Sequence, residues 1–206
     1  MNKKILIFTA TFNEAENIEY FIKSVMLEIP YSNLLIVDDN SPDGTSNKIK
    51  ELQKTFQNLH LIIRNKKEGL DSAHKLGFKF AKENQYNYFI TLDADLSHNP
   101  NEIKKFIDEL SVNSFVIGSR YMNGSQCLTS AKRLLISKMG NKLIKLMSGL
   151  EGTEFTTSFR GFNLDKLNNF DLFDVKNKGY SFFMGTLFEI DKLGEPYIAG
   201  ECASHL

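Results

Sequence analysis

The chain has 206 residues, of which 42% are hydrophobic and 24% charged, a balance typical of one globular domain with a substantial core. Its 25 basic and 25 acidic residues cancel, which argues against a strongly basic nucleic-acid-binding protein and against an acidic disordered tail. The two cysteines lie far apart and favour a reducing compartment. The apolar runs are shorter than a signal sequence or a membrane span requires, so we expect a soluble or peripheral cytoplasmic protein.

Short apolar runs alternate with helical patterns along the chain. The runs predict strands buried on both faces at residues 4–9, 33–38, 59–64, 86–93 and 114–119. Between them, apolar residues recur every three or four positions within residues 18–26, 70–80 and 103–110, as on one face of a helix. Because parallel strands need crossover connections, this order predicts an open, Rossmann-like α/β fold with a mostly parallel sheet flanked by helices.

Polar residues follow the ends of these predicted strands, at the sheet edge where ligands bind in open α/β folds. They are Asn13, Glu14, Asp38, Asp39, Asp43, Asp93, Asp95 and Arg120. Helix capping and turn formation explain one or two of them, and we favour that structural interpretation for Asp43 and Asn17. Several carboxylates on one edge repel one another unless a cation or a ligand's hydrogen-bond donors share the site.

Asp93 and Asp95 are one residue apart, directly after the fourth predicted strand. In extended geometry the period of two points both side chains the same way. Two such carboxylates can hold Mg²⁺ or Mn²⁺ while the cation also binds a diphosphate. The alternative interpretation is that Asp95 only begins a turn before a helix at Pro100.

Five segments carry a resemblance to a known family. They read TFNEAEN, VDDNSPDGT, LDADLSHNP, GSRY and TTSFRGF, in this order along the chain. The chain resembles family 2 glycosyltransferases with the GT-A fold, and most closely the dolichyl-phosphate or polyprenyl-phosphate mannosyltransferases (synthases). The resemblance extends from residue 5 to about residue 193. It implies a nucleotide-diphosphate sugar as donor, an inverting hexose transfer and a divalent metal.

The resemblance also assigns parts of the site. The donor-binding residues that it implies are Ala10, Phe12, Glu14, Asp38, Asp39, Gly69 and Asp95. The implied metal ligands are Asp93, Asp95 and Ser97, and the implied catalytic residues are Asp93, Asp95 and Arg120. Gly69 would let the backbone approach the donor closely. The alternative for this segment is an ordinary helix N-terminus with Asp71 in the first turn.

Residues 130–150 contain five basic side chains, together with eight large apolar ones within residues 134–147. Such a segment suits the surface of an anionic membrane, or a phosphate headgroup with a long apolar tail; the alternative is a helix packed on the sheet with solvated lysines. Arg133 and Ser137 lie one helical turn apart. In the resembling synthases an arginine and a serine at this spacing, with the arginine matching Arg120, bind the lipid phosphate. We therefore expect polyprenyl or dolichyl phosphate as acceptor, on the cytoplasmic face of a membrane.

We expect one domain over residues 1–206, with residues 1–125 binding nucleotide sugar and metal and residues 126–206 forming the acceptor side. Three departures from the family pattern lie in the second part. Gly185 stands where a glutamate is usual, Glu154 stands where an aspartate is usual, and the sequence ends before the basic loop that the family would add.

These departures leave alternatives open. One is a UDP-sugar-dependent family 2 transferase acting on a glycan or a lipid-linked hydroxyl group. Another is a non-catalytic descendant that binds nucleotide sugar. A nucleotidyltransferase is a more distant alternative, because the segment after the first predicted strand contains no glycine-rich phosphate loop.

Overall fold

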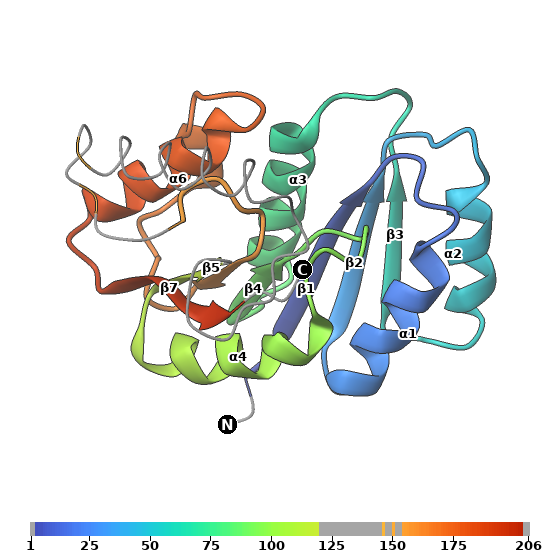
Figure 1. Cartoon of the computed structure of the whole chain (residues 1–206), viewed down its shortest axis with the longest axis horizontal. Helices are drawn as coiled ribbons and strands as arrows, with labels where there is room; N and C mark the ends of the chain where they lie inside the picture. The colour runs from blue at the N-terminus through green and yellow to red at the C-terminus, as the bar shows by residue number, and fades with distance from the viewer. Residues whose placement is uncertain (1–2, 120–145, 147–149, 151–153, 204–206) are drawn as a thin grey trace, which may run out of the picture.

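The computed structural model describes residues 3–119, 146, 150 and 154–203 (Figure 1). The elements in chain order are β1 (Ile5–Thr11), α1 (Ile18–Glu28), β2 (Asn33–Asp38), α2 (Thr45–Gln53), β3 (Leu59–Ile63), α3 (Leu70–Glu83), β4 (Tyr88–Thr91), η1 (Pro100–Glu102), α4 (Ile103–Val112), β5 (Phe115–Ser119), β6 (Arg160–Asn163), η2 (Leu172–Asp174), α6 (Ser181–Asp191) and β7 (Tyr197–Ala203).

The strands form one seven-stranded sheet in the order β3-β2-β1-β4-β6-β5-β7. Every neighbouring pair is parallel except the two that involve β6, which runs antiparallel to both β4 and β5. The predicted mostly parallel sheet is therefore confirmed. The carboxyl ends of β1 to β4 meet at one edge, and the amino end of the reversed β6 comes to that same edge.

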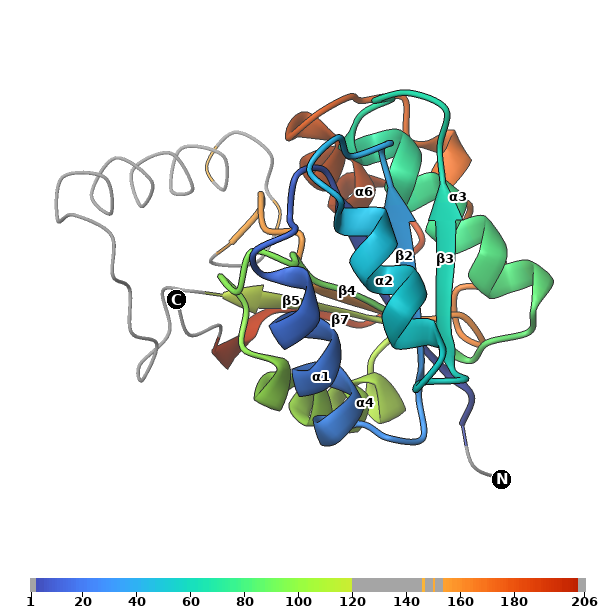
Figure 2. The same cartoon turned by 90° about the vertical axis from the view of Figure 1, so that its right-hand side faces the viewer.

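Alternation along β1 divides the core between the two faces of the sheet. Leu6 and Phe8 pack on one face with α3 and α6, whereas Ile5 and Ile7 pack on the other with α1, α2 and α4. Figures 1 and 2 show the helices lying over these two faces. The helical stripes predicted from the sequence form the buried faces of α1 and α4. On α3 the predicted Leu70, Leu76 and Phe80 are only partly buried, and the buried face is formed by Ala73, His74, Gly77, Phe78 and Ala81.

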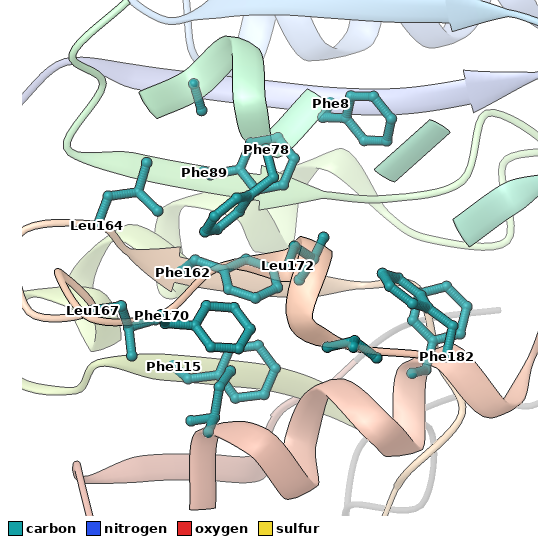
Figure 3. Packing of buried hydrophobic residues seen from close by; sticks show 14 of the residues in the cluster. Phe8, Phe78, Phe89, Phe115, Phe162, Leu164, Leu167, Phe170, Leu172 and Phe182 are labelled. Carbon is teal, nitrogen blue, oxygen red and sulfur yellow. The ribbon is translucent and has the colours of Figure 1, made fainter. Parts of the chain in front are cut away.

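Aromatic rings fill much of the space between the sheet and the helices α3 and α6 (Figure 3). Phe78 of α3 meets Phe89, Phe162 and Phe170 edge-on, with ring centres 5.7–5.8 Å apart. Edge-to-face pairs at this spacing are favourable beyond the area that they bury. This packing fixes α3 on the sheet and so sets where its N-terminus lies at the carboxyl edge.

Three features of the sheet were not expected. The strand β7 was not among the predicted strands. β3 is an edge strand and, among the described residues, pairs with β2 alone, so its residues are mostly half-buried and the prediction of burial on both faces is wrong for this strand. β6 was not predicted at all. Its four residues, RGFN, carry no apolar run, and they join the sheet because β4 and β5 flank them on both sides.

Gly77 of α3 packs directly on the ring of Phe8, and a Cβ at this position would overlap the ring. Phe8 lies fully buried in the middle of β1 and has little room to move. We expect Gly77→Ala to lower the free energy of unfolding by about 1–3 kcal/mol through overpacking, although alanine favours a helix. Urea denaturation measures the change, with exposed Lys79→Ala on the same helix as control. An unchanged or raised stability would contradict the contact.

Candidate active site

An open pocket of about 530 Å³ lies at the carboxyl edge of the sheet. Its walls come from the ends of β1 and β4, the N-termini of α3 and α6, and the segment before β6. The lining residues are Ala10, Glu14, Leu70, Asp93, Ala94, Asp95, Ser97, His98, Thr156, Thr157, Ser158, Tyr180 and Phe183. The structure thus brings together Ala10, Glu14, Asp93, Asp95 and Ser97 from the predicted set.

The acidic pair lies in the loop that follows β4. The Asp93 side chain is 40% exposed, Asp95 is exposed, and both line the pocket. Asp95 Oδ1 also accepts a hydrogen bond from Ser97 N at 3.0 Å. Leu96, between Asp95 and Ser97, has a φ of 65°. This left-handed conformation is costly for a branched residue and typical of functional loops. Asp95 therefore both forms a turn and presents a carboxylate to the pocket.

Glu14 adds a third carboxylate to this wall. Its partial burial raises its pKa above the ordinary 4.5, the hydrogen bond from Asn17 Nδ2 lowers it, and the charges of Asp95 and Asp93 raise it further. None of the described lining residues is a lysine or arginine that could neutralise these acids. Excess negative charge at the pocket wall is the electrostatic setting that a bound cation relieves.

The donor set fits a hard divalent cation, because the available ligands are carboxylate and hydroxyl oxygens. Within the described part of the chain, no cluster of three or more His, Cys, Asp or Glu side chains is arranged to hold a metal ion by itself. A cation here would therefore take further ligands from water or from a bound diphosphate. Asp93, Asp95 and Ser97 stay the predicted ligands.

A narrower slot of about 160 Å³ adjoins this pocket and shares Ala10 and Leu70 with it. Its other lining residues are Thr11, Phe12, Asp39, Arg64, Lys67 and Gly69. Four residues of the predicted donor site, Ala10, Phe12, Asp39 and Gly69, therefore lie in the slot. It leads from an aromatic ring to the acidic pocket.

Two basic residues that the sequence interpretation missed complete the slot. Arg64, at the end of β3, forms a buried ion pair with Asp39 and donates to Gly69 O at 3.0 Å. The Lys67 ammonium lies 3.9 Å from the centre of the Phe12 ring, a cation–π distance. Arg64 could have been found as a charged residue closing an apolar run at the same sheet edge as the acids.

Asp38 and Asp39 are neighbours with different surroundings. Asp38 is fully buried and accepts hydrogen bonds from Thr11 Oγ1, Ser41 N, Ser41 Oγ and Ser46 Oγ at 2.6–2.9 Å. It lines neither the pocket nor the slot. The structure therefore does not place Asp38 in the cavities where a donor contact was expected. The Asp38 oxygens accept four hydrogen bonds that hold the loop after β2 to the end of β1 and to α2.

The loops after β1 and β2 are tied together. Three successive amides, those of Asn13, Glu14 and Ala15, donate to Ser41 Oγ, Thr45 Oγ1 and Asp43 Oδ2 at 2.9–3.0 Å. Asp43 Oδ1 accepts from the backbone and hydroxyl of Thr45, so its predicted turn role is confirmed. Asn17 does not cap α1 with its side chain, which is used to hold Glu14 instead.

The opposite wall is formed by the segment before β6. Glu154, whose aspartate counterpart is usual in the resembling family, accepts at Oε1 from Phe155 N, Thr156 N and Thr156 Oγ1 at 2.9–3.2 Å. Arg160 is fully buried and donates to three backbone carbonyls, of Thr157, Phe155 and Phe183, at 2.6–2.8 Å. These bonds join the wall to α6.

Gly185 of α6 does not line the pocket. A Cβ at this position would overlap Asn177 Oδ1 and lie 3.0 Å from Val175 Cγ1. Val175 is buried, whereas Asn177 is exposed. Side chains of the segment before α6 therefore occupy the space where a larger residue would stand.

The predicted acceptor residues Arg120, Arg133 and Ser137 lie outside the described residues, and so does nearly all of the basic amphipathic segment. Their assignments stay predictions. No helix within the described residues is long and apolar enough to cross a membrane.

His74 of α3 is packed among the rings of Phe8, Phe182 and Phe183, and this burial, with nearby Arg160, lowers its pKa to about 3. Between pH 6.5 and 3 the histidine is protonated in the unfolded chain but not in the folded one. The free energy of unfolding therefore decreases as the pH is lowered, and at pH 5 it is about 2 kcal/mol below its value at neutral pH. We expect His74→Leu to remove this contribution in urea denaturation at several pH values. The half-buried His60 is the control, since His60→Leu should change the slope less; equal slopes for wild type and His74→Leu would contradict the prediction.

Comparison with known proteins shows the family to which the chain belongs. Residues 6–170 match the model of Glycosyl transferase family 2. The chain belongs to this family. Its members are enzymes that transfer sugars, so the chain is a glycosyltransferase, and the nucleotidyltransferase alternative is set aside.

Two curated relatives are similar over most of the chain. An undecaprenyl-phosphate mannosyltransferase from Micrococcus luteus is 31% identical over 93% of this chain and 79% of its own length. A polyprenol monophosphomannose synthase from Mycolicibacterium smegmatis is 32% identical over 87% of this chain and 69% of its own.

Solved structures with the same fold are more distant in sequence. A mannosyltransferase from Pyrobaculum calidifontis, in complex with GDP-Man and Mn²⁺, is 16% identical with a TM-score of 0.67 over all of this chain and 57% of its own. A glucosyl-3-phosphoglycerate synthase from Mycobacterium tuberculosis, in complex with Mn²⁺, UDP and phosphoglyceric acid, is 14% identical with a TM-score of 0.69 over 98% of this chain and 69% of its own. These likenesses confirm the GT-A fold of this family 2 enzyme.

Proposed function

We propose that this glycosyltransferase moves a hexose, mannose being the first candidate, from a nucleotide-diphosphate sugar such as GDP-mannose to polyprenyl or dolichyl phosphate. The names of the two curated relatives support mannose as the sugar and a polyprenyl phosphate as the acceptor. Inversion at the anomeric carbon follows from the family resemblance stated above.

The observation that carries the proposal is the slot that opens into the acidic pocket at Ala10 and Leu70. A slot with an aromatic ring and a carboxylate, Phe12 and Asp39, suits a nucleoside, whose base can stack and donate hydrogen bonds. The adjoining pocket, with Asp93 and Asp95, suits the diphosphate and its cation. The order of the two cavities is thus the order of groups in a nucleotide-diphosphate sugar.

In this proposal Asp93, Asp95 and Ser97 hold Mg²⁺ or Mn²⁺, which when bound stabilises the charge of the departing diphosphate. Phe12 and Asp39 orient the nucleoside, and Gly69 permits a close approach of the donor to the N-terminus of α3. Glu14 and the wall at Thr156–Ser158 border the space that remains for the sugar. The chain's contribution to the rate is then positioning and electrostatic stabilisation.

A phosphate acceptor removes the need for a general base. Its oxygens are already largely ionised near neutral pH, so attack on the anomeric carbon requires little proton removal. A hydroxyl acceptor would need a base within hydrogen-bond reach. We assign no base to Glu14, Asp93 or Asp95, and we keep Arg120, Arg133 and Ser137 as the proposed partners of the acceptor phosphate.

The site of action in this proposal is the cytoplasmic surface of a membrane, with the chain bound peripherally as one domain of residues 1–206. The composition of residues 130–150 supports it, since basic and apolar side chains together suit an anionic lipid surface. Polyprenyl phosphates have tails that stay in the bilayer, so the enzyme must meet the headgroup there.

The test is calorimetric titration with GDP and UDP, each with and without Mn²⁺, on the wild type and on the Asp93→Ala, Asp95→Ala double variant. We expect metal-dependent binding of GDP that the double variant loses, followed by mannose transfer from GDP-mannose to polyprenyl phosphate. Metal-dependent binding of UDP alone would overturn the GDP-mannose assignment. Binding of neither nucleotide would overturn the donor site.

A further inference from the structure

His98 is buried, although it belongs to the exposed acidic loop of the pocket. Its Nδ1 atom lies 3.1 Å from the backbone nitrogen of Asp93, and its Nε2 atom lies 3.2 Å from Thr157 Oγ1. The two partners belong to opposite walls of the pocket and are far apart in the sequence. The imidazole therefore bridges the acidic loop and the wall before β6.

These contacts determine which ring nitrogen carries the proton. The Asp93 amide can only donate, so Nδ1 must offer its lone pair. In the neutral ring the hydrogen is then on Nε2, which donates to Thr157 Oγ1. The Thr157 hydroxyl oxygen also accepts from Phe159 N at 3.2 Å, so two donors converge on it.

The ring is also held by packing. Its centre lies 5.2 Å from that of Phe159, whose ring in turn stacks on Phe106 of α4 at 4.0 Å and 17°. Phe159 and Phe106 are fully buried, so the imidazole stands on a rigid base. Two hydrogen bonds and the tilted ring of Phe159 hold both the position and the rotation of His98.

The acidic loop needs such a support. Leu96 holds a left-handed backbone conformation between Asp95 and Ser97, and relaxing it would turn the loop. The hydrogen bond from the Asp93 N–H to His98 Nδ1 fixes the peptide at the start of the loop. The hydrogen bond from the Ser97 N–H to Asp95 Oδ1 fixes the turn. Together they hold the two carboxylates on the same side of the pocket.

We propose that His98 is a positioning residue of the donor site. As the Nε2–H tautomer it fixes the Asp93 backbone and sets the distance between the acidic loop and the Thr156–Ser158 wall. Its importance for metal binding rests on the proposed function, in which Asp93 and Asp95 hold a divalent cation. The bridge itself does not depend on that function.

The first test is independent of metal and nucleotide. ¹⁵N NMR of the ligand-free chain at neutral pH should find the His98 ring protonated on Nε2 and unprotonated on Nδ1, and hydrogen exchange should find the Asp93 amide protected. A ring protonated on Nδ1 would overturn the proposal, because that nitrogen could not accept from Asp93. So would an Asp93 amide that exchanges as fast as an unprotected one.

The second test separates the two contacts by substitution. His98→Phe keeps an aromatic ring and removes both hydrogen bonds, whereas the side-chain oxygen in His98→Asn can take the place of Nδ1. In the presence of GDP we expect His98→Phe to bind Mn²⁺ about 10- to 100-fold more weakly than wild type, the usual effect of losing a supporting contact. His98→Asn should recover most of this loss and restore protection of the Asp93 amide.

His60→Phe is the control, because it makes the same chemical change on β3, where His60 contacts Asn33 outside the pocket. Mn²⁺ affinity in folded His98→Phe equal to that of wild type would overturn the positioning role. If His98→Phe does not fold, His98→Asn decides: Mn²⁺ affinity and Asp93 amide protection that are kept together or lost together support the role, and a change in one without the other overturns it. A wild-type chain that binds neither Mn²⁺ nor GDP would overturn the proposed function instead, and the NMR result would still decide the bridge.

Discussion

Asp95→Ala is expected to abolish sugar transfer, lowering kcat by at least about 100-fold while the fold stays intact. The Asp95 carboxylate is exposed at the pocket and is the second acid of the proposed metal site. Removing it leaves the departing diphosphate without its full charge stabilisation. A radiolabelled transfer assay from GDP-mannose to polyprenyl phosphate measures the loss.

The stability of the same variant distinguishes a functional from a structural role. Asp95 raises the pKa of Glu14 by charge repulsion, so its removal relieves part of that repulsion. This relief offsets the lost hydrogen bond from Ser97 N to Asp95 Oδ1, so we expect the thermal midpoint of Asp95→Ala to stay close to that of wild type. Asp108→Ala is the control, an exposed acid on α4 beside the amino ends of β1 and β4, where transfer should not change. Substantial turnover in Asp95→Ala would rule out the proposed metal site.

Arg160→Met is expected to cause the largest loss of stability, about 3 kcal/mol or more in urea denaturation. The guanidinium donates to three buried carbonyls, and its removal leaves all three without that donor, at about 1–3 kcal/mol each. Relief of the buried charge offsets part of this cost, since burial already lowers the Arg160 pKa to about 9. The stability of Arg160→Lys should lie between those of wild type and Arg160→Met, because one ammonium group cannot make all the hydrogen bonds of the planar guanidinium.

Lys166→Met provides the matched control for Arg160. Lys166 is exposed and donates to a single carbonyl, that of Val112, so its loss should cost less than about 1 kcal/mol. If Arg160→Met were no more destabilising than this control, the three bonds would not hold the pocket wall to α6. We also expect Arg160→Met to bind the donor more weakly, because Arg160 holds the wall in which Thr156 to Ser158 line the pocket.

The conformation of the acidic loop was only partly predictable. Its two aspartates were identified from their spacing after an apolar run, and both line one pocket. The extended geometry that motivated this prediction holds only to Thr91, after which the backbone bends and Leu96 turns left-handed. The side chains share the pocket because a turn and a buried histidine hold the loop.

Glycines carried information that was visible but could not be interpreted from the sequence. Gly77 lies within the predicted helical stripe of residues 70–80, and its missing side chain allows α3 to lie on Phe8. Gly185 looked like a lost functional carboxylate, whereas its α-carbon faces Asn177 and Val175. Both roles depend on a neighbour from another segment, which composition and periodicity do not reveal.

The sequence by itself determined the first five strands, the helices α1, α3 and α4 between them, the sheet edge that carries the acids, and the glycosyltransferase family. These properties follow from apolar periodicity and local motifs, which are set by residues within a few positions of one another. The tertiary structure alone decided the insertion of β6 between β4 and β5, the separate surroundings of Asp38 and Asp39, and the bridge from His98 to Thr157. Each of these depends on pairing between segments far apart in the chain, whose geometry exists only once the sheet has formed.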